Sequence, residues 1–388
     1  MKKIFSTKYK YGNKILYLSI LICFSLIAFY NIKIGFIMSP DSSTFSRWAD
    51  DLIKLNFNFY EYYDQNTYIR SNIFYTIPVL LIAVLKLTFE TGWQNSFMFL
   101  NLIFVLFSFI IFSRILKLLK VRPLIISLSI PLLSLSADLL TWPRYILSDT
   151  FFSFLIILTF YFMIRGIVNE KLYYIVLSFL IFIMFLTRPT SIPYIFIFII
   201  FLSFSNIKFN FNPKIILLFI LLLSLITPVI LTLFYQLTKI YFINNSQLLT
   251  FINWVDAGMI IHDRPETWVN PPNTFIDIVY IYFKRYLFFF NPYISAFSLI
   301  HIVLNLLQTL VIFLSLIFWF FFSETYRAIN KSVLLILLVC FSVAIFHSFT
   351  LIDYDWRYRF PIILPLTIIF PISLEIVTKR LIPDFSRF

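Results

Sequence analysis

The sequence contains little charge, little glycine and very few cysteines or histidines. Only 13% of its 388 residues are charged, whereas soluble domains carry about 25%. Its two cysteines, Cys23 and Cys340, both lie within apolar runs, so no disulfide framework or cysteine-based metal site is predicted. The three histidines lack metal-ligand spacing, and the five glycines form no phosphate-binding loop. These shortages exclude the usual signatures of zinc-dependent and nucleotide-binding enzymes.

Apolar residues are abundant. They make up 61% of the chain, and the mean hydropathy is +0.91. Apolar runs of about 17 to 26 residues recur, and at about 1.5 Å per residue each is long enough for a helix to cross a hydrocarbon core of about 30 Å. We therefore predict an all-α integral membrane protein in one transmembrane domain, residues 1–388, with ten spans near 15–31, 96–117, 122–140, 150–168, 172–187, 190–206, 214–236, 296–322, 332–350 and 361–378.

The distribution of basic residues predicts the topology. The first run follows five lysines without a small-residue cleavage site, so we expect an uncleaved span with a cytoplasmic N-terminus. An eleventh run, Ile73–Phe89, contains Pro78 and Lys86. If it crossed, the basic residues at 114–122 would face the wrong side. We therefore expect Ile73–Phe89 to be an interfacial or half-inserted helix and both termini to be cytoplasmic.

This topology gives the external face the long loops, at 32–95, 237–295 and 351–360, and 14 of the 18 carboxylates. The net charge of +13 is dispersed through short loops, which indicates topology and not a nucleic-acid-binding surface. Function is therefore expected at the external face. We assign a catalytic module to residues 1–206 and further spans to residues 207–388.

The first external loop contains Asp41. Helical spacing of Phe45, Trp48, Leu52 and Leu55 predicts a helix on the membrane surface that begins at Asp41. Asp41 is then either an N-cap or a catalytic carboxylate, and its residue type suits both roles equally.

A second site is predicted where Asp149 opens a span and Arg188 lies in Thr187-Arg188-Pro189. Asp149 suits an N-cap even better than Asp41 does. Arg188 is expected either to extend toward the headgroups or to hold a phosphate. The topology places both residues at the same membrane face as Asp41.

The densest charged and aromatic cluster precedes the last span and contains Arg357, Tyr358 and Arg359. This cluster is interpreted either as part of a binding site or as an aromatic belt with locally paired charges. Of the other polar residues, Lys284 and Arg285 are weaker phosphate candidates. Glu375 and Lys379 have the spacing of an ordinary helical ion pair.

In order and spacing, four short motifs resemble the membrane-embedded GT-C glycosyltransferases. The resemblance is to the bacterial group similar to dolichyl-phosphate-mannose protein mannosyltransferases and lipid A aminoarabinose transferase, glycosyltransferase family 39. The matching pieces are Pro40-Asp41-Ser42 with Phe45, Ser148-Asp149, Thr187-Arg188-Pro189, and Arg357-Tyr358-Arg359-Phe360-Pro361. They cover most of the first half of the chain and its end.

The resemblance implies a GT-C fold and transfer of a sugar from a polyprenyl-phosphate donor to a lipid, glycan or protein acceptor. The site would face the periplasm or exterior of a bacterial inner membrane. Asp41 would be the base, Asp149 would bind acceptor or sugar, and the phosphate and donor would be held by Arg188, Arg357, Tyr358 and Arg359. No resident cofactor is implied. Because Ser42 replaces the second acidic residue of the family's first-loop pair, a divalent metal remains open.

Two other functions are consistent with the sequence. A cell-envelope polysaccharide polymerase or ligase would also have many spans and external arginines. A transporter is less favoured, because transporters use glycine-broken or proline-broken helices and charges at the membrane midplane. This chain has five glycines, and its charges lie mainly at the predicted span ends.

Overall fold

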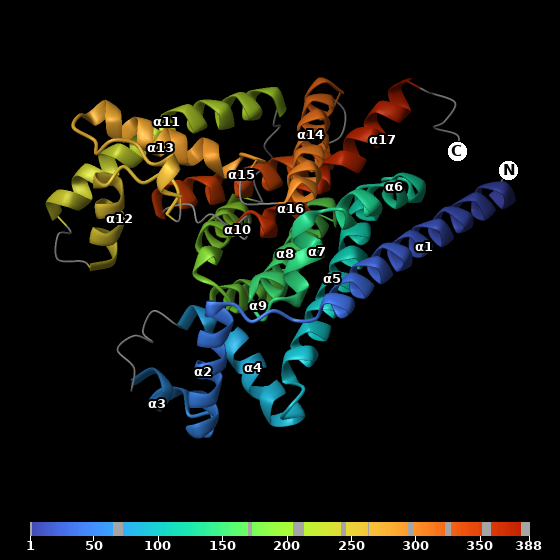
Figure 1. Cartoon of the computed structure of the whole chain (residues 1–388). Helices are drawn as coiled ribbons and strands as arrows, with labels where there is room; N and C mark the ends of the chain where they lie inside the picture. Colours follow the sequence, from blue (N-terminus) through green and yellow to red (C-terminus); the bar gives the residue numbers. More distant parts are fainter. Residues whose placement is uncertain are drawn as a thin grey trace.

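The computed structural model describes residues 2–64, 73–169, 173–204, 213–241, 246–262, 264–293, 298–322, 327–350 and 358–381. Across these ranges the chain is helical, and the β-pairing within them is a single bridge between Ile37 and Tyr145. The helices form a large group, and α2, α3 and α4 extend from it at the bottom of Figure 1. The all-α class predicted from the sequence is confirmed.

Among the described residues, seven helices are long and apolar enough to cross a membrane. This length follows from runs of apolar side chains that lie in lipid without breaking the helix. The seven are α1 (Lys2–Ile34), α5 (Trp93–Leu118), α8 (Asp149–Asn169), α11 (Pro213–Tyr241), α14 (Leu299–Phe322), α15 (Arg327–Thr350) and the continuous pair α16 (Phe360–Thr367) and α17 (Ile369–Leu381).

The other three predicted spans take different forms. The run at 122–140 is a broken helix, in which α6 (Pro123–Ser134) and the segment beginning with α7 (Ala137–Thr141) meet at 67°. Those at 172–187 and 190–206 correspond to α9 (Tyr174–Phe185) and α10 (Ile192–Phe204), with 12 and 13 residues. A helix of that length covers only about 20 Å. Among the described residues, seven helices, or eight with the bent pair, therefore have the length and composition of a span, and the count of ten stays a prediction.

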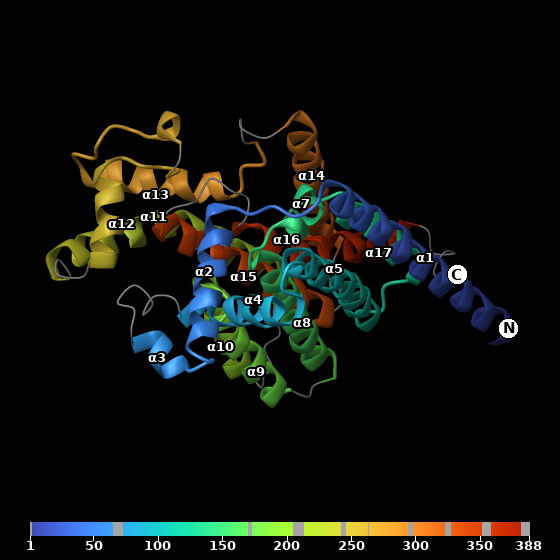
Figure 2. The ribbon, with the colours of Figure 1, turned by 60° about the horizontal axis from the view of Figure 1, so that its bottom comes forward.

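The first external loop folds into α2 (Pro40–Lys54), α3 (Phe59–Asp64) and α4 (Thr76–Phe89), which Figure 2 shows side by side. The expected stripe is present: Phe45 and Leu52 are buried against α4. The predicted helix start at Asp41 is wrong by one residue. Pro40 takes the first helical position, which its fixed φ suits, and Ser39 and Ser42 form the capping box.

The charge in the run Ile73–Phe89 has a partner on α2. Lys86 Nζ lies 2.7 Å from Asp50 Oδ1 and donates to the Ser46 carbonyl at 3.0 Å. It also lies 5.1 Å from the Trp93 ring. Lys86 is therefore satisfied by packing α4 on the amphipathic helix α2.

Contacts between distant residues define two ends of the helical group. At one end, a Cβ on Gly12 of α1 would lie 3.3 Å from Pro123, and Arg122 Nε bonds to Glu375 Oε2 of α17 at 3.1 Å. The predicted pair of Glu375 and Lys379 is confirmed there, at 3.1 Å. The chain therefore brings the starts of α1 and α6 together with the end of α17.

At the opposite end, the chain leaving α1 meets the segment before α8. The Ile37 amide donates to the Arg144 carbonyl at 2.8 Å, and Asn31 Nδ2 donates to Leu140 O at 3.0 Å. Trp93, which opens α5, packs in the same cluster as Ile146. The segment between α1 and α5 thus starts and finishes at one end, which is the path expected if Ile73–Phe89 does not cross.

The second predicted external loop contains α12 (Ser246–Asp256), the short η4 (Pro265–Thr267) and α13 (Phe275–Phe289). These lie with α11 at the upper left of Figure 1. Arg285 of α13 is fully buried and donates to the Met259 carbonyl from Nε at 2.9 Å and from Nη2 at 2.7 Å. This arginine holds the loop to α13.

Candidate functional site

Asp149 and Arg188 form a buried ion pair. Asp149 is the first residue of α8, and Arg188 lies in the break between α9 and the short η3 (Pro189–Ser191). Arg188 Nη1 donates to Asp149 Oδ1, and the two side chains are only 2% and 1% exposed. Arg188 therefore does not extend toward headgroups, and Asp149 has a role beyond any contribution to the helix start.

Tyr358 joins this pair to the last span. The guanidinium of Arg188 lies 5.1 Å from the centre of the Tyr358 ring, within the range of a cation–π contact. On the same ring, His347 of α15 approaches to 4.8 Å between ring centroids. His347 itself stacks on Phe289 of α13, with an angle of 11° between the planes. Tyr358 therefore contacts the break before η3 and the helix α15 directly, and α13 through His347.

Several residues close in sequence to Asp149 or Arg188 carry buried hydroxyls that lack hydrogen-bond partners among the described residues. We name this set the hydroxyl cluster: Ser148, Thr150, Ser153, Ser191 and Tyr194. Three lie at or just before the start of α8, one ends η3 and one lies in the first turn of α10. The two starts touch, because the Tyr194 ring packs edge-on against Phe152 at 5.5 Å.

A buried hydroxyl without a hydrogen-bond partner is energetically unfavourable. An unpaired buried hydroxyl costs about 1–3 kcal/mol, and the penalty in an apolar protein is not relieved by nearby water. Five such hydroxyls are therefore available to donate and accept hydrogen bonds. The arrangement therefore has the chemistry of a ligand site.

Arg359, the neighbour of Tyr358, has a different environment. Its Nη1 donates to the carbonyls of Phe289 at 2.8 Å and Asn291 at 2.6 Å. Those carbonyls belong to the last residue of α13 and to the chain just after it, where a cation is favoured by the helix dipole. Arg359 thus links α13 to the start of α16.

The structure also reveals a carboxylate that the sequence reasoning missed. Asp138 on α7 is 1% exposed, accepts a hydrogen bond from Trp142 Nε1 at 3.1 Å, and interacts electrostatically with Arg359. Its signal in the sequence was a single carboxylate inside the apolar run at 122–140. The bend between α6 and α7 places it in the interior.

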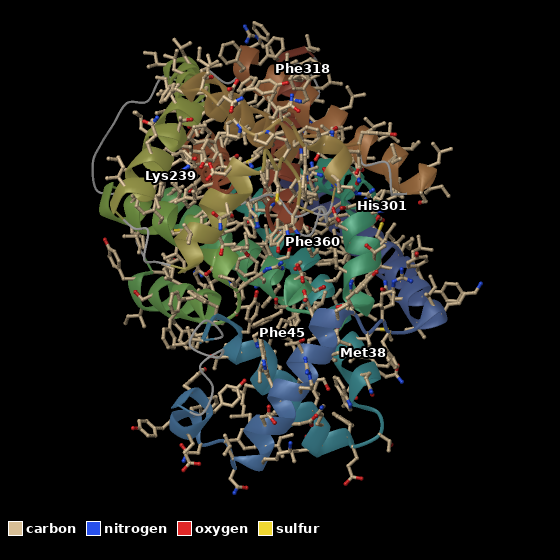
Figure 3. All side chains as sticks on the ribbon, turned by 60° about the vertical axis from the view of Figure 1, so that its left-hand side comes forward. Met38, Phe45, Lys239, His301, Phe318 and Phe360 are labelled. Atoms are coloured by element: carbon tan, nitrogen blue, oxygen red, sulfur yellow. The ribbon has the colours of Figure 1, made fainter. Side chains whose placement is uncertain are left out.

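Asp41 is not in this buried region. It lies in the first turn of α2 and is exposed to solvent. Figure 3 shows its chain neighbours Met38 and Phe45 among the lower helices, and Phe360 of α16 nearer the centre. The bridge between Ile37 and Tyr145 nevertheless ties the entry to α2 directly to the entry to α8.

The remaining predicted residues are Arg357, Arg285 and Lys284. Arg357 lies outside the described residues. Arg285 donates its hydrogen bonds to backbone carbonyls. Burial lowers its pKa to about 10, which still leaves it charged at neutral pH. Lys284 lies 4.8 Å from the Tyr280 ring. The described residues include no group of three or more histidine, cysteine or acidic side chains able to hold a metal ion, and metal dependence stays open.

Comparisons of this chain with protein-family models, with curated proteins and with solved structures found no match. The class of protein therefore follows from the fold and the site alone. The chain is an α-helical membrane protein with a buried site made from an ion pair, hydroxyls and aromatic rings.

Proposed function

We propose that this protein is a membrane glycosyltransferase of the GT-C type. It would move a sugar from a polyprenyl-phosphate donor to a lipid, glycan or protein acceptor at the external face of the membrane. One observation carries the proposal: three of the four motifs of the resemblance contribute residues to a single buried polar site. These residues are Asp149, Arg188 and Tyr358, which are separated by 39 and 170 positions in the chain.

The chemistry needs a base and a place for the leaving phosphate. An acceptor hydroxyl attacks the anomeric carbon, its proton passes to a carboxylate, and the bond from that carbon to the lipid phosphate breaks. Asp41 is the proposed base, because an exposed carboxylate at the membrane surface is accessible to an incoming acceptor. Asp149 is proposed to bind donor or acceptor within the buried site.

For the phosphate, Arg188, Arg357 and Arg359 are the proposed ligands. A guanidinium offers two parallel charge-assisted hydrogen bonds that an ammonium does not reproduce. Replacing the arginine that binds phosphate by lysine should therefore raise the apparent KM for the donor or lower turnover, although the charge is kept. Equal transfer rates by all three lysine variants across a donor titration would place the phosphate elsewhere, with Lys284 next to test.

The central experiment is a transfer assay. Purified protein is incubated with radiolabelled polyprenyl-phosphate sugars and a membrane extract, and sugar incorporation into lipid, glycan and protein fractions is measured. At least one donor should label one fraction only when active protein is present. Label in a growing glycan would identify a polymerase or ligase. No transfer from any donor of a broad panel would contradict the proposal.

A second candidate, a transporter for a polar solute, is supported by two features. The helix α6–α7 is bent by 67° within the apolar run. On the spanning helix α14, Asn305 is fully buried, and neither of its amide atoms has a hydrogen-bond partner among the described residues. Broken helices and buried polar side chains are typical of transport sites. Transport needs sealed proteoliposomes, whereas sugar transfer proceeds in detergent, and this difference separates the two functions.

A further inference from the structure

We infer that α1 and α5, at their ends away from the candidate site, bind the headgroup of an anionic phospholipid. The binding groups are four cations, which we name the basic cluster: Lys14 on α1, Arg114 and Lys117 on α5, and Lys120 in the turn after α5. The inference goes beyond the proposed function and does not depend on it, because the cluster lies at the opposite end of the helical group from Asp149.

Contacts between α1 and α5 bring the cations of the basic cluster to one place. Lys117 Nζ lies 5.2 Å from the centre of the Tyr17 ring on α1, and Lys14 lies about one helical turn before Tyr17. Arg114 lies about one turn before Lys117, and the Lys120 amide donates to the Lys117 carbonyl at 3.0 Å. Figure 2 shows α1 beside α5. The cluster therefore joins two helices that are far apart in the sequence.

The basic cluster lacks acidic partners. None of its four cations forms an ion pair with any part of the chain that the structure describes. At the same end of the helical group, Glu375 pairs with Arg122 and with Lys379, each at 3.1 Å. That carboxylate is therefore already shared by two other cations. Like charges on adjacent helical turns repel each other, so an anion from outside the chain is favoured between them.

The surroundings of the cluster favour a lipid as the source of this anion. Arg114 is exposed and continues a stripe of exposed apolar residues on α5, Phe99, Ile103 and Phe107, each between 46% and 48% exposed. A cation at the end of such a stripe lies at the level of the headgroups. Tyr17 is also exposed, and tyrosine is enriched at that level. A phospholipid therefore fits with an acyl chain along the stripe and its phosphate at the basic cluster.

The charge of the cluster selects an anionic lipid over a zwitterionic one. Phosphatidylcholine carries a positive choline beside its phosphate, and four nearby cations repel it. Phosphatidylglycerol and cardiolipin carry phosphate without a compensating cation, and clustered basic residues at the ends of spanning helices attract such headgroups. The attraction acts near the membrane surface, so dissolved salt screens it.

The test is a lipid titration of the full chain in detergent. Purified, delipidated protein is titrated with fluorescent phosphatidylglycerol, cardiolipin or phosphatidylcholine with the same acyl chains, and fluorescence anisotropy measures binding at low and at physiological salt. Arg114→Gln, Lys117→Gln, Lys117→Arg and the double glutamine variant are compared with wild type. The matched control is Arg165→Gln on α8, which removes another cation beside a tyrosine, 4.8 Å from the Tyr173 ring. Inorganic phosphate is the competitor that distinguishes a small anion from a lipid headgroup.

Wild type should bind both anionic lipids about tenfold or more tightly than phosphatidylcholine. Each single glutamine variant should weaken anionic-lipid binding about fivefold, the usual contribution of one basic residue near an anionic headgroup. The double variant should lose more than either, and Lys117→Arg should keep the affinity because it keeps the charge. Phosphatidylcholine binding should not change, and Arg165→Gln should match wild type for every lipid. The preference for anionic lipid should decrease at higher salt.

Equal binding of phosphatidylcholine and the anionic lipids would overturn the inference. So would an equal loss in Arg165→Gln, which would mean that positive charge anywhere at this end attracts lipid. Complete displacement of the lipid by millimolar inorganic phosphate would assign the cluster to a small anion and also overturn it. Thermal unfolding of each variant without lipid checks folding. Arg114 is exposed, so Arg114→Gln decides the question even if the loss of Lys117 from the Tyr17 ring affects stability.

Discussion

Asp149 and Arg188 show how burial makes two charged residues depend on each other. Two charges removed from solvent are tolerated only while they face each other. Asp149 therefore fixes Arg188 in the break after α9, and Arg188 in turn supports Tyr358. A site of this kind is sensitive to the loss of either partner.

The first prediction concerns this pair. Asp149→Asn or Arg188→Gln alone breaks the buried ion pair and should destabilise the protein by about 3–5 kcal/mol. The double variant should lose less than the sum of the two, because neither charge remains. Thermal unfolding in a single detergent measures all three variants. Asp51→Asn, from an exposed pair with Lys54 at 3.4 Å, is the control and should change stability by less than about 1 kcal/mol. Additive single effects would show that the pair is not coupled.

The second prediction concerns Asp41. Asp41→Asn should reduce sugar transfer by about 10²- to 10⁴-fold, the usual contribution of a general base. Stability should be unchanged, because Ser39 and Ser42 cap α2 and Asp41 is exposed. Asp51→Asn on the same helix serves as the matched control and should keep wild-type activity. Near-normal transfer by Asp41→Asn would exclude it as the base and make the buried Asp138 the next carboxylate to replace.

At the scale of elements, breaks in helices bring polar groups into the interior. The 67° bend between α6 and α7 buries Asp138, and the break after α9 buries Arg188. Helix ends carry unsatisfied amides and carbonyls. In an apolar protein, these ends and the side chains beside them gather where they can satisfy one another. The break at Thr187-Arg188-Pro189 therefore shortens α9 and α10 and builds the site at the same time.

The third prediction tests a turn in the second external loop. Gly258 has a positive φ of 69°, and a Cβ there would lie 2.1 Å from the Val269 carbonyl oxygen. Gly258→Ala should therefore destabilise the segment between α12 and α13 by more than the roughly 1–2 kcal/mol of left-handed backbone strain alone. Gly35→Ala is the matched control, since Gly35 also has positive φ, at 85°, but open space around it. Limited proteolysis and thermal unfolding measure both. Equal effects would mean that the close approach at Gly258 is relieved by a shift of the loop.

At the scale of the whole molecule, the two ends of the helical group differ in what they carry. One end joins Gly12, Arg122 and Glu375, and the other joins Ile37 with Tyr145. The helix α8 starts from the second end with Asp149. The proposed site and the helix α2 that carries Asp41 therefore lie toward one end of the molecule, and residues near the two termini lie toward the other.

The fourth prediction concerns the membrane topology that this arrangement implies. With Cys23 and Cys340 replaced by serine, a cysteine at Gln94 should react with a membrane-impermeant maleimide added outside intact cells. A cysteine at Lys120 should react only after the membrane is permeabilised. The two sites lie at opposite ends of α5, so each is the control for the other. The reverse pattern would contradict both the cytoplasmic termini and the external position of the proposed site.

Much of the fold followed from local sequence. Long apolar runs predict spanning helices because a backbone in lipid must satisfy its own hydrogen bonds, and seven such helices are present among the described residues. Spacing predicted the buried stripe of α2, and sequence separation predicted the pair of Glu375 and Lys379. One wrong detail arose where local alternatives competed, because Ser39 and not Asp41 caps α2. The described parts of α9 and α10 are short, so the spans predicted there stay predictions.

Identifying the candidate site needed both the sequence and the tertiary structure. Asp149, Arg188 and Tyr358 were selected from short motifs in the sequence, and their roles stay predictions. The packing of α8, α10, α15 and α16 brings these residues into contact. They are 39 and 170 positions apart in the chain, and contacts over such separations depend on how the helices are arranged. No periodic pattern in the sequence reports them. For the same reason the sequence missed Asp138, whose burial depends on a bend, and could not show that Arg359 binds carbonyls of α13. The sequence by itself determined that the chain is a helical membrane protein and which polar residues it contains. Only the tertiary structure decided which charges pair and which hydroxyls are buried without a partner among the described residues, because both depend on how the helices pack.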